Sequence, residues 1–435
     1  MKTRILITTA LLALSSQLAL ADNWPGLRGP NHDGSSEETG LPTKFSKTEN
    51  VKWVADLPGP SGASPIIWGD HVFVSSANPE TKKLHAMCFD RKSGKQLWDK
   101  EVADGYKQDD RSNLAGPTPT TDGERAYFFY GTSDLVAFDF KGNKIWHRNI
   151  QKDYGSFAFL WTFSTSPMVY GGKLYMQVLQ RDVSFKAWGR DVGRADGKND
   201  SYLLALDPKS GEEIWRVIRP AKAKAESLEA FTTPVIYKHK GKDQLLITGG
   251  DCITGHDPET GKELWRWGTW NPTRIGHWRL VPSPVAGAGV ALACAPKKNP
   301  IYAVNLDNAM LEWSSEDKEV SSDVSTPAFY KGNFFIINSD RKSLCRVAPD
   351  GHVHYAERIE TCNSKIEASP TVADGKIYAI NHRGQAFVFS AGGEYKLLHQ
   401  TEMADSKDEL VRSTITVSGG NLFIRTDNKL YCIGK

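Results

Sequence analysis

One short pattern recurs along almost the whole chain and limits what it can fold into. A Ser-Pro or Thr-Pro pair precedes a short strand, a polar turn follows, and a second apolar strand comes next, as in PMVYGGKLYMQV and PTVADGKIYAI. The apolar residues alternate, and Gly-Gly or Asp-Gly supplies the positive φ of a hairpin turn. Starts spaced by about 43 to 67 residues are typical of four-stranded propeller blades. The starts are Ser64-Pro65, Thr118-Pro119, Ser166-Pro167, Thr233-Pro234, Ser283-Pro284, Thr326-Pro327 and Ser369-Pro370, with a degenerate eighth at Ser413-Thr414-Ile415.

The second half of the repeat carries a turn and a tryptophan at fixed spacing. CFDRKSGKQLW, ALDPKSGEEIW and GHDPETGKELW each place Asp, then Gly four residues later, then Trp four residues after that. The Asp side chain can accept backbone hydrogen bonds of the turn, and the Gly supplies its left-handed residue. One Trp per repeat at one register predicts packing between blades, although a row of tryptophans can also form a carbohydrate platform. The expected blade-docking tryptophans are Trp53, Trp98, Trp146, Trp215, Trp265 and Trp313, with Tyr355 and Leu397 at the same position in two other repeats.

The two ends of the repeat region complement each other. The last segment, STITVSGGNLFIRTDNKLYCIGK, supplies three strands and stops before an outer strand, whereas VKWVADLP at 51–58 has the outer-strand character that is missing. Pairing the two would close a ring and remove an exposed sheet edge. The sequence therefore predicts an all-β, eight-bladed β-propeller of four-stranded blades, or seven blades if one weak repeat is a loop. The expected blades are 63–102, 115–150, 163–218, 229–269, 280–317, 323–359, 367–405, and 411–435 with 51–58.

The first 21 residues have the features of a signal peptide. Lys2 and Arg4 form a basic start, an apolar core follows, and Ala19-Leu20-Ala21 is a small-x-small cleavage site. A buried N-terminal helix is the alternative. No Cys follows the apolar core to carry a lipid anchor, and no later segment has the roughly 20 apolar residues of a membrane span. We therefore expect a soluble, periplasmic or secreted protein cleaved after Ala21, with an N-terminal extension at 22–50 and the propeller at 51–435.

Charge and cysteine content narrow the partners and leave the disulfides open. The formal net charge is only +3, without a run of Lys and Arg, which argues against nucleic acid or an anionic membrane as the main partner. Six cysteines allow many pairings in an exported protein, and no CxxC pair is present. Cys88, Cys345 and Cys432 align with Ala205 of another repeat, which favours buried structural thiols. Cys362 falls in an expected loop and is predicted to be the exposed one.

The ALDPKSGEEIW-type segments resemble the tryptophan-docking motif of the pyrroloquinoline-quinone (PQQ) propeller superfamily, over nearly all of the mature chain. That superfamily includes quinoprotein alcohol dehydrogenases and BamB, a non-enzymatic subunit of the outer-membrane β-barrel assembly machine. The resemblance implies the fold and leaves the cofactor open. The chain lacks the adjacent cysteines of the dehydrogenases, a motif for calcium ligands, and the lipidation cysteine of BamB. We therefore expect no cofactor and no metal, with PQQ plus calcium as the alternative.

Three segments depart from the minimal repeat and are the candidates for a binding site. They are YGSFAFLWTF before the third blade, the insert RDVSFKAWGRDVGRADGKND within it, and TWNPTRIGHWRL before the fifth blade. Loops at the strand starts form the usual binding face of a propeller, and a long insert is often functional. Interleaved aromatic and arginine side chains can bind anionic or planar ligands. The candidates are Trp161, Arg181, Trp188, Arg190, Trp270, Arg274, His277, Trp278 and Arg279.

These candidates also have structural interpretations. Trp270 and Trp278 can fill the wedge between blades, and His277 lacks the spacing of a metal site, which favours a hydrogen-bonded structural histidine. Charged residues that precede the strand starts would surround the channel mouth, either as mutual salt bridges or around a small polar ligand. This second group comprises Glu229, Arg279, Asp323, Glu367 and Arg412.

The sequence favours a non-catalytic, monomeric scaffold or binding protein of the cell envelope, with a protein partner or a small ligand. No Ser/His/Asp, HExxH or phosphate-loop motif is present. Two alternatives stay open, because propellers host many functions. One is a small-molecule or saccharide binder that uses the insert, and the other is a PQQ- and calcium-dependent dehydrogenase, so the sequence does not decide whether the protein is an enzyme.

Overall fold

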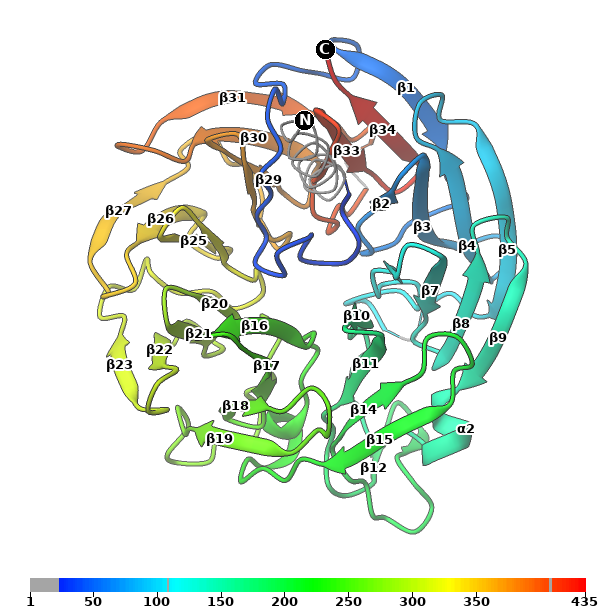
Figure 1. Cartoon of the computed structure of the whole chain (residues 1–435), viewed down its shortest axis with the longest axis vertical. Coiled ribbons are helices and arrows are strands. Elements are labelled where there is room, and N and C mark those ends of the chain that lie inside the picture. The colour runs from blue at the N-terminus through cyan, green and yellow to red at the C-terminus, as the bar shows by residue number, and fades with distance from the viewer. Residues whose placement is uncertain (1–22, 108, 407–408) are drawn as a thin grey trace, which may run out of the picture.

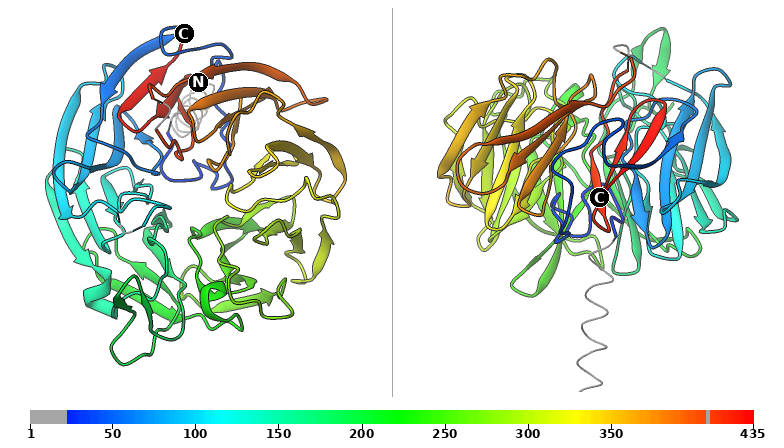
Figure 2. Two further views of the ribbon diagram at one scale, coloured as in Figure 1. Left: turned by 180° about the vertical axis from the view of Figure 1, so that it is seen from behind. Right: turned by 90° about the horizontal axis from the view of Figure 1, so that it is seen from above.

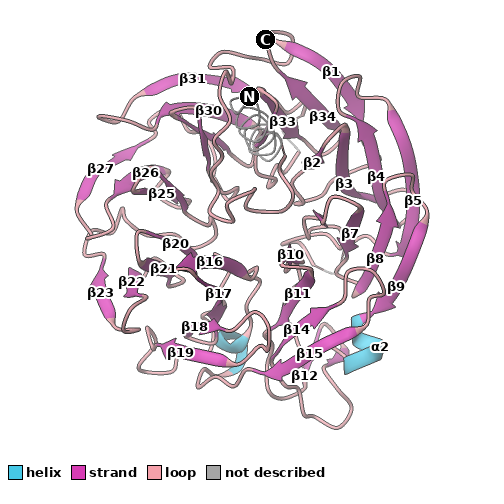
Figure 3. Cartoon of the chain, in the orientation of Figure 1, coloured by secondary structure: helices cyan, strands magenta, loops and turns pink. Residues whose placement is uncertain are grey.

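The strands of the computed structural model form a closed ring of eight four-stranded antiparallel sheets around a central channel (Figure 1). The structure describes residues 23–107, 109–406 and 409–435, so the predicted signal peptide and its cleavage site lie outside the described residues. Strands dominate, and the helices are short (Figure 3). Within this described part the ring has eight blades, and the seven-bladed alternative is wrong.

Each blade follows chain order from the channel to the rim, except the last. Blades 1 to 4 consist of β2 (Ile66–Trp68), β3 (His71–Asn78), β4 (Lys83–Asp90) and β5 (Gln96–Asp104); β6 (Thr120–Thr121), β7 (Arg125–Phe129), β8 (Asp134–Asp139) and β9 (Lys144–Asn149); β10 (Met168–Tyr170), β11 (Lys173–Val178), β14 (Tyr202–Leu206) and β15 (Glu213–Ile218); and β16 (Val235–His239), β17 (Lys242–Gly249), β18 (Cys252–His256) and β19 (Glu263–Trp267). Blades 5 to 8 consist of β20 (Val285–Gly287), β21 (Val290–Cys294), β22 (Ile301–Asn305) and β23 (Leu311–Ser314); β24 (Ala328–Tyr330), β25 (Asn333–Asn338), β26 (Ser343–Val347) and β27 (Val353–Arg358); β28 (Thr371–Ala373), β29 (Lys376–Ile380), β30 (Gln385–Ser390) and β31 (Leu397–Glu402); and β32 (Thr416–Ser418), β33 (Asn421–Arg425), β34 (Lys429–Ile433) and β1 (Val51–Asp56).

The Ser/Thr-Pro pairs tie neighbouring blades together around the channel. The backbone N–H of Ser64 donates to Thr118 Oγ1 at 3.0 Å, and the N–H of Thr118 donates to Ser166 Oγ at 3.0 Å. The recurring hydroxyl therefore satisfies a buried N–H of the preceding blade, which the proline pattern alone does not reveal. Equivalent bonds run from Ser166 to Thr233, from Thr233 to Ser283, from Ser283 to Thr326, from Thr326 to Ser369, and from Thr414 to Ser64.

Five of the six predicted docking tryptophans contact the turn of the next blade. The indole N–H of Trp98 donates to Phe140 O at 3.0 Å, and its ring lies against Gly142. A Cβ at Gly142 would lie 2.8 Å from this ring, so the close approach requires glycine, as does the φ of 82°. Trp53, Trp146, Trp215 and Trp313 donate in the same way to the carbonyls of Arg91, Pro208, Pro258 and Pro349.

Trp265 departs from this pattern. Its indole N–H donates within its own blade to Gln244 Oε1 at 2.7 Å, and its ring lies close to Gly255 of the same blade. In the next blade Ala309, with a φ of 57°, occupies the turn position at which Gly142 accepts Trp98. The indole N–H of Trp265 therefore does not reach the turn of blade 5, although its ring still packs against the core cluster that blades 4 and 5 share.

The N-terminal strand closes the ring as predicted. β1 pairs antiparallel with β34, and Trp53 lies opposite Cys432, so β1 is the outer strand of blade 8 (Figure 1). A buried arginine also stabilises the contact between blades 8 and 1. The Arg425 side chain is buried, with 1% of the residue exposed, and donates to the carbonyl of Ser75 in blade 1 and, at 3.0 Å, to that of Gly59 in the connection from β1 to β2.

Residues 23–50 run through the inside of the ring before they reach β1 (Figure 1). Trp24 is fully buried and forms a β-bridge with Ile67 in blade 1, and Ser35 forms another with Val372 in blade 7. The Glu38 carboxylate accepts the N–H groups of Gly419 and Gly420, both at 2.9 Å, in a hairpin turn of blade 8. The segment therefore lines the channel near the face that carries the hairpin turns.

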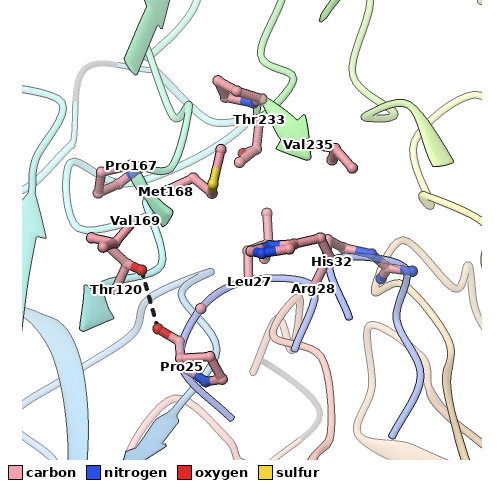
Figure 4. A pocket seen from close by; sticks show the side chains of 12 residues that line it. Pro25, Leu27, Arg28, His32, Thr120, Pro167, Met168, Val169, Thr233 and Val235 are labelled. Carbon is pink, nitrogen blue, oxygen red and sulfur yellow. Dashed lines mark hydrogen bonds between the residues drawn. The ribbon is translucent and has the colours of Figure 1, made fainter. Parts of the chain in front are cut away.

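We call this face, which carries the turn between the first two strands of each blade and the turn between the last two strands of blades 1 to 7, the turn face. The opposite face carries the middle turn of each blade and the connections between blades, and we call it the loop face. Strands run between the two faces across the thickness of the ring (Figure 2). A small cavity of about 20 Å³ remains in the channel between the N-terminal segment and blades 2 to 4. Leu27 and His32 face Met168, Thr233 and Val235 across it (Figure 4).

All six cysteines are free and buried. Cys88 and Cys432 lie opposite Trp98 and Trp53, at the place that Ala205 takes opposite Trp215, as the alignment predicts. The alignment of Cys345 is wrong by one residue, because Arg346 lies opposite the tryptophan position held by Tyr355. Cys362 is only 6% exposed, and its Sγ lies 3.0 Å from Ser364 O, so the prediction that it is exposed is also wrong.

Candidate functional site

The loop face brings the three irregular segments of the sequence together. The connections 150–167 and 268–284 lie on it, and so does the insert, which joins β11 to β14. The insert forms its own hairpin from β12 (Phe185–Ala187) and β13 (Arg190–Val192), in a loop that extends past the edge of the ring (Figure 1). The side chains of this hairpin meet those of the connections between blades.

Trp161 lies at the centre of a cluster that we call the arginine–tryptophan site. The Cζ atoms of Arg111 and Arg279 lie 5.3 and 5.5 Å from the centroid of its ring. Trp188 meets the same ring at 5.7 Å and an interplanar angle of 63°, and Arg190 lies 5.8 Å from the Trp188 ring. These distances fit cation–π contacts. The site consists of Arg111, Trp161, Trp188, Arg190, Glu226 and Arg279.

Glu226 holds the centre of the site in place. It follows the first residue of a short 3₁₀ helix (Ala225–Leu228), and its Oε1 accepts the Trp161 indole N–H at 3.0 Å and an Arg279 N–H at 2.9 Å. Its charge therefore balances that of Arg279. Arg111 and Arg190 are exposed and make no ion pair with any described residue. The site consequently carries two exposed guanidinium groups that form no ion pair with a described residue.

Trp188 is the most unusual member of the site. It forms the tip of the hairpin with Gly189, at φ values of 49° and 74°, and 53% of it is exposed. Two successive residues with positive φ fit a type I′ turn, which normally uses Asn, Asp or Gly. A bulky residue in the left-handed region is strained, and such strain often accompanies function. Trp188 therefore has the position of a contact residue and not that of a core residue.

Arg181 and Glu229 anchor the base of the insert. Arg181 Nε donates to Glu229 Oε1 at 2.6 Å, the N–H of Leu160 donates to Oε2 at 3.1 Å, and the Arg181 guanidinium lies 4.0 Å from the Phe185 ring. Glu229 is fully buried, and burial raises the pKa of its carboxyl to about 7, although the charge of Arg181 opposes this shift. Arg181 and Glu229, both predicted as site residues, therefore fix the base of the insert and are not contact residues of the site.

The structure does not bring the remaining residues of the 268–284 connection into the site. Trp270 is 4% exposed and stacks on Tyr302 at 6.5 Å, so it belongs to the core between blades 4 and 5. Trp278 also packs partly against that core. Arg274 donates to Thr269 Oγ1 at 3.1 Å, and His277 is exposed.

The predicted ring of charges at the channel mouth is divided into local pairs. Asp323 accepts the backbone N–H of Lys297 at 2.7 Å, whereas Glu367 lies 2.7 Å from His382 Nε2 and 3.2 Å from Arg412 Nε. Burial alone would raise the pKa of the Glu367 carboxyl. The hydrogen bond and charge of His382, together with the charge of Arg412, outweigh burial and lower this pKa to about 2.

The contacts of Glu367 with His382 and Arg412 are expected to make the stability of the protein depend on pH. A carboxyl whose pKa falls from an ordinary 4.5 to about 2 on folding stabilises the protein above pH 4.5, and this contribution disappears as the pH falls through 2. Glu367→Gln should therefore lose about 2 to 4 kcal/mol of unfolding free energy at pH 7 and almost none near pH 2. Urea unfolding of both proteins across this range measures the difference. A deficit that is constant with pH would contradict the assignment.

A hollow of about 300 Å³ adjoins the arginine–tryptophan site, which is at the lower limit of the size range of small-ligand pockets. It lies between β13 and the connection 150–167, so the insert forms one of its walls. Phe159 and Phe163 stack at 4.5 Å on the other side. The side chains that shape it include Gln151, Phe157, Phe159, Trp161, Phe163 and Arg190.

The residues at the channel mouth do not fit a quinone with its calcium ion. Calcium needs six to eight oxygen ligands that converge on one point. Glu229, Asp323 and Glu367 stand at different blades, and each already has a partner. The described residues also contain no group of three or more His, Cys, Asp or Glu that is able to hold a metal ion.

Sequence reasoning missed two members of the site and one structural role. Arg111 lies in the connection 105–119 and Glu226 in the connection 219–234, and neither connection stands out from the others by its length or composition. Asp109 joins the first of these connections to the site, because its Oδ2 accepts the N–H of Thr162 at 2.6 Å. The path of residues 23–50 through the channel was also not predicted.

Comparison with known proteins agrees with this architecture. A europium-containing methanol dehydrogenase superposes with a TM-score of 0.66 at 12% identity, over 95% of this chain and 92% of that one. The quinohemoprotein alcohol dehydrogenase of Comamonas testosteroni superposes with a TM-score of 0.65 at 13% sequence identity, over 97% of this chain and 82% of that one. BamB of Moraxella catarrhalis superposes with a TM-score of 0.59 at 12% sequence identity, over 88% of this chain and 99% of that one. These identities establish the shared fold alone.

The family comparison is more specific. A search of curated protein sequences gives no significant match. None of the helices in the described residues has the length and apolar character needed to cross a membrane. The sequence model of the family described as outer membrane protein assembly factor BamB matches residues 38–189 and 199–435, which is most of the chain. The chain therefore belongs to the BamB family of PQQ-like repeat propellers.

Proposed function

We propose that this protein is a non-catalytic scaffold of the cell envelope that binds a protein partner on its loop face, at the arginine–tryptophan site. The observation that carries the proposal is Trp188, which is 53% exposed at a strained hairpin tip and packs on Trp161. Tryptophan and arginine are the side chains most enriched at the hot spots of protein interfaces. An exposed Trp between guanidinium groups adds little to the stability of the ring, so binding is its best explanation.

Two further observations support this proposal. The N-terminal segment occupies the channel near the turn face, where Glu38 fixes it to blade 8, so the loop face is the more open end. The family description names an assembly factor of the outer membrane, which supports an exported protein with protein partners in the envelope.

A photo-reactive residue placed on each face tests the proposal. Lys186 is exposed beside the site on the insert, and Lys209 is exposed in a turn of blade 3 on the turn face. In growing cells the probe at 186 should give a discrete adduct with a protein, and the probe at 209 should give none. Adducts from position 209 alone, or equal adducts from both, would refute the assignment of the loop face.

The alternative of a quinone-dependent dehydrogenase has a separate test. The purified mature protein is mixed with PQQ and calcium, and its melting temperature and dye-linked alcohol oxidation are measured. We expect neither stabilisation nor turnover. Turnover would overturn the proposal of a non-catalytic protein, whereas stabilisation without turnover would favour the binding of a small molecule.

A further inference from the structure

We infer that the partner presents an acidic segment to the arginine–tryptophan site, in which carboxylate side chains flank an apolar one. This inference rests on the proposed function and specifies the chemistry of the partner. Its starting point is the imbalance of charge at the site. Three guanidinium groups, those of Arg111, Arg190 and Arg279, face the two tryptophan rings, and Glu226 balances one of them.

The neighbouring charges do not remove this imbalance. Arg181 is paired with the buried Glu229 at 2.6 Å, and Lys186 lies 3.9 Å from Asp191 across the insert hairpin. The Asp109 carboxylate accepts the backbone N–H of Arg111 at 2.7 Å and two hydrogen bonds from Thr162, but it forms no ion pair with the Arg111 guanidinium. A partner therefore meets two accessible guanidinium groups that form no ion pair with any described residue.

The geometry of these guanidinium groups favours carboxylates. A guanidinium that stacks on a ring uses its flat face, which leaves the N–H groups at its edge free for bidentate hydrogen bonds. The Cζ atoms of Arg111 and Arg190 lie 5.3 and 5.8 Å from the centroids of the Trp161 and Trp188 rings, within the range of cation–π contacts. Carboxylates on both sides of the tryptophan pair would each find one such edge.

The exposed ring of Trp188 favours an apolar side chain between the carboxylates. Trp188 is 53% exposed, and its ring lies beside Arg190 and packs against Trp161. An aromatic or aliphatic side chain of the partner would bury surface against this ring, while the carboxylates beside it reach the arginines. The hollow beside Trp161 exposes more polar than apolar surface, so the apolar contact is assigned to Trp188.

The adduct formed by the probe at Lys186 tests the inference directly. Mass spectrometry of the cross-linked peptide should identify a partner segment with at least two Asp or Glu residues around an apolar residue. A neutral or basic segment, or an adduct with a glycan, would overturn the inference while leaving the loop face as the binding face. The absence of any adduct would instead contradict the proposed function itself.

Charge reversal provides the second measurement. Arg111→Glu and Arg190→Glu should each lower the adduct yield about tenfold or more, since a charge-assisted hydrogen bond is replaced by repulsion. Arg358→Glu is the matched control, because Arg358 is exposed on the outer strand β27, away from the site. Arg111→Gln and Arg190→Gln should give intermediate yields. Unchanged melting curves would show that the ring is intact, and undiminished yields from both Glu variants would overturn the inference.

Discussion

A chain without residues 23–56 is expected not to form the native ring. This truncation removes Trp24 and Phe45, which are both fully buried, together with Trp53 and the whole of β1. Loss of a buried tryptophan or phenylalanine costs about 3 to 5 kcal/mol, so three of them exceed or match the typical total stability of about 5 to 15 kcal/mol. The edge of β34 would also lose its partner strand. Circular dichroism and urea unfolding should show no cooperative native transition.

A peptide of residues 23–56 added in trans provides the control for this truncation. It should restore part of the cooperative transition, because the segment makes its contacts with blades 1, 6, 7 and 8 through hydrogen bonds that do not require a covalent link. A truncated chain that unfolds cooperatively at the same urea concentration as the full chain would contradict the assigned role of this segment.

Trp53→Ala is expected to lower the unfolding free energy by about 3 to 5 kcal/mol, since Trp53 is 7% exposed and joins blade 8 to blade 1. Trp265→Ala is the matched control at the same position of another repeat. It should cost about half as much, because Trp265 is half-buried and donates only within its own blade. Urea unfolding measures both values. Equal losses of unfolding free energy would show that the contact of Trp53 with blade 1 adds no more stability than the contact of Trp265 within its own blade.

The blades could be predicted because the signals for them are local and periodic. The Asp-to-Gly-to-Trp spacing fixes a turn and its outer strand within about 10 residues, and the closing strand has the same character. The exceptions arise where the turn of one repeat differs from the others. The turn of blade 5 has Ala309 in place of glycine, and the indole N–H of Trp265 does not reach it. Cys345 leaves its alignment because the turn before Tyr355 is one residue shorter.

The candidate site was predicted in part, for a similar reason. Its aromatic and arginine residues stand out as departures from the repeat, which identified Trp161, Trp188, Arg190 and Arg279. Arg111 and Glu226 lie in ordinary polar connections, and only the folded ring brings them to Trp161. Trp270 has the composition of a site residue, but its burial against Tyr302 could not be read from the sequence.

The binding role of the loop face is tested most directly by removing the insert hairpin. Residues 183–198 are replaced by a Gly-Gly turn, and a photo-reactive residue at the exposed Lys224 reports on partner contact in growing cells. The melting curve should stay close to that of the full chain, because Arg181, Glu229 and the blade strands remain. The partner adduct should fall at least about tenfold, as expected when hot-spot residues are lost. An undiminished adduct from a normally folded variant would contradict the central claim.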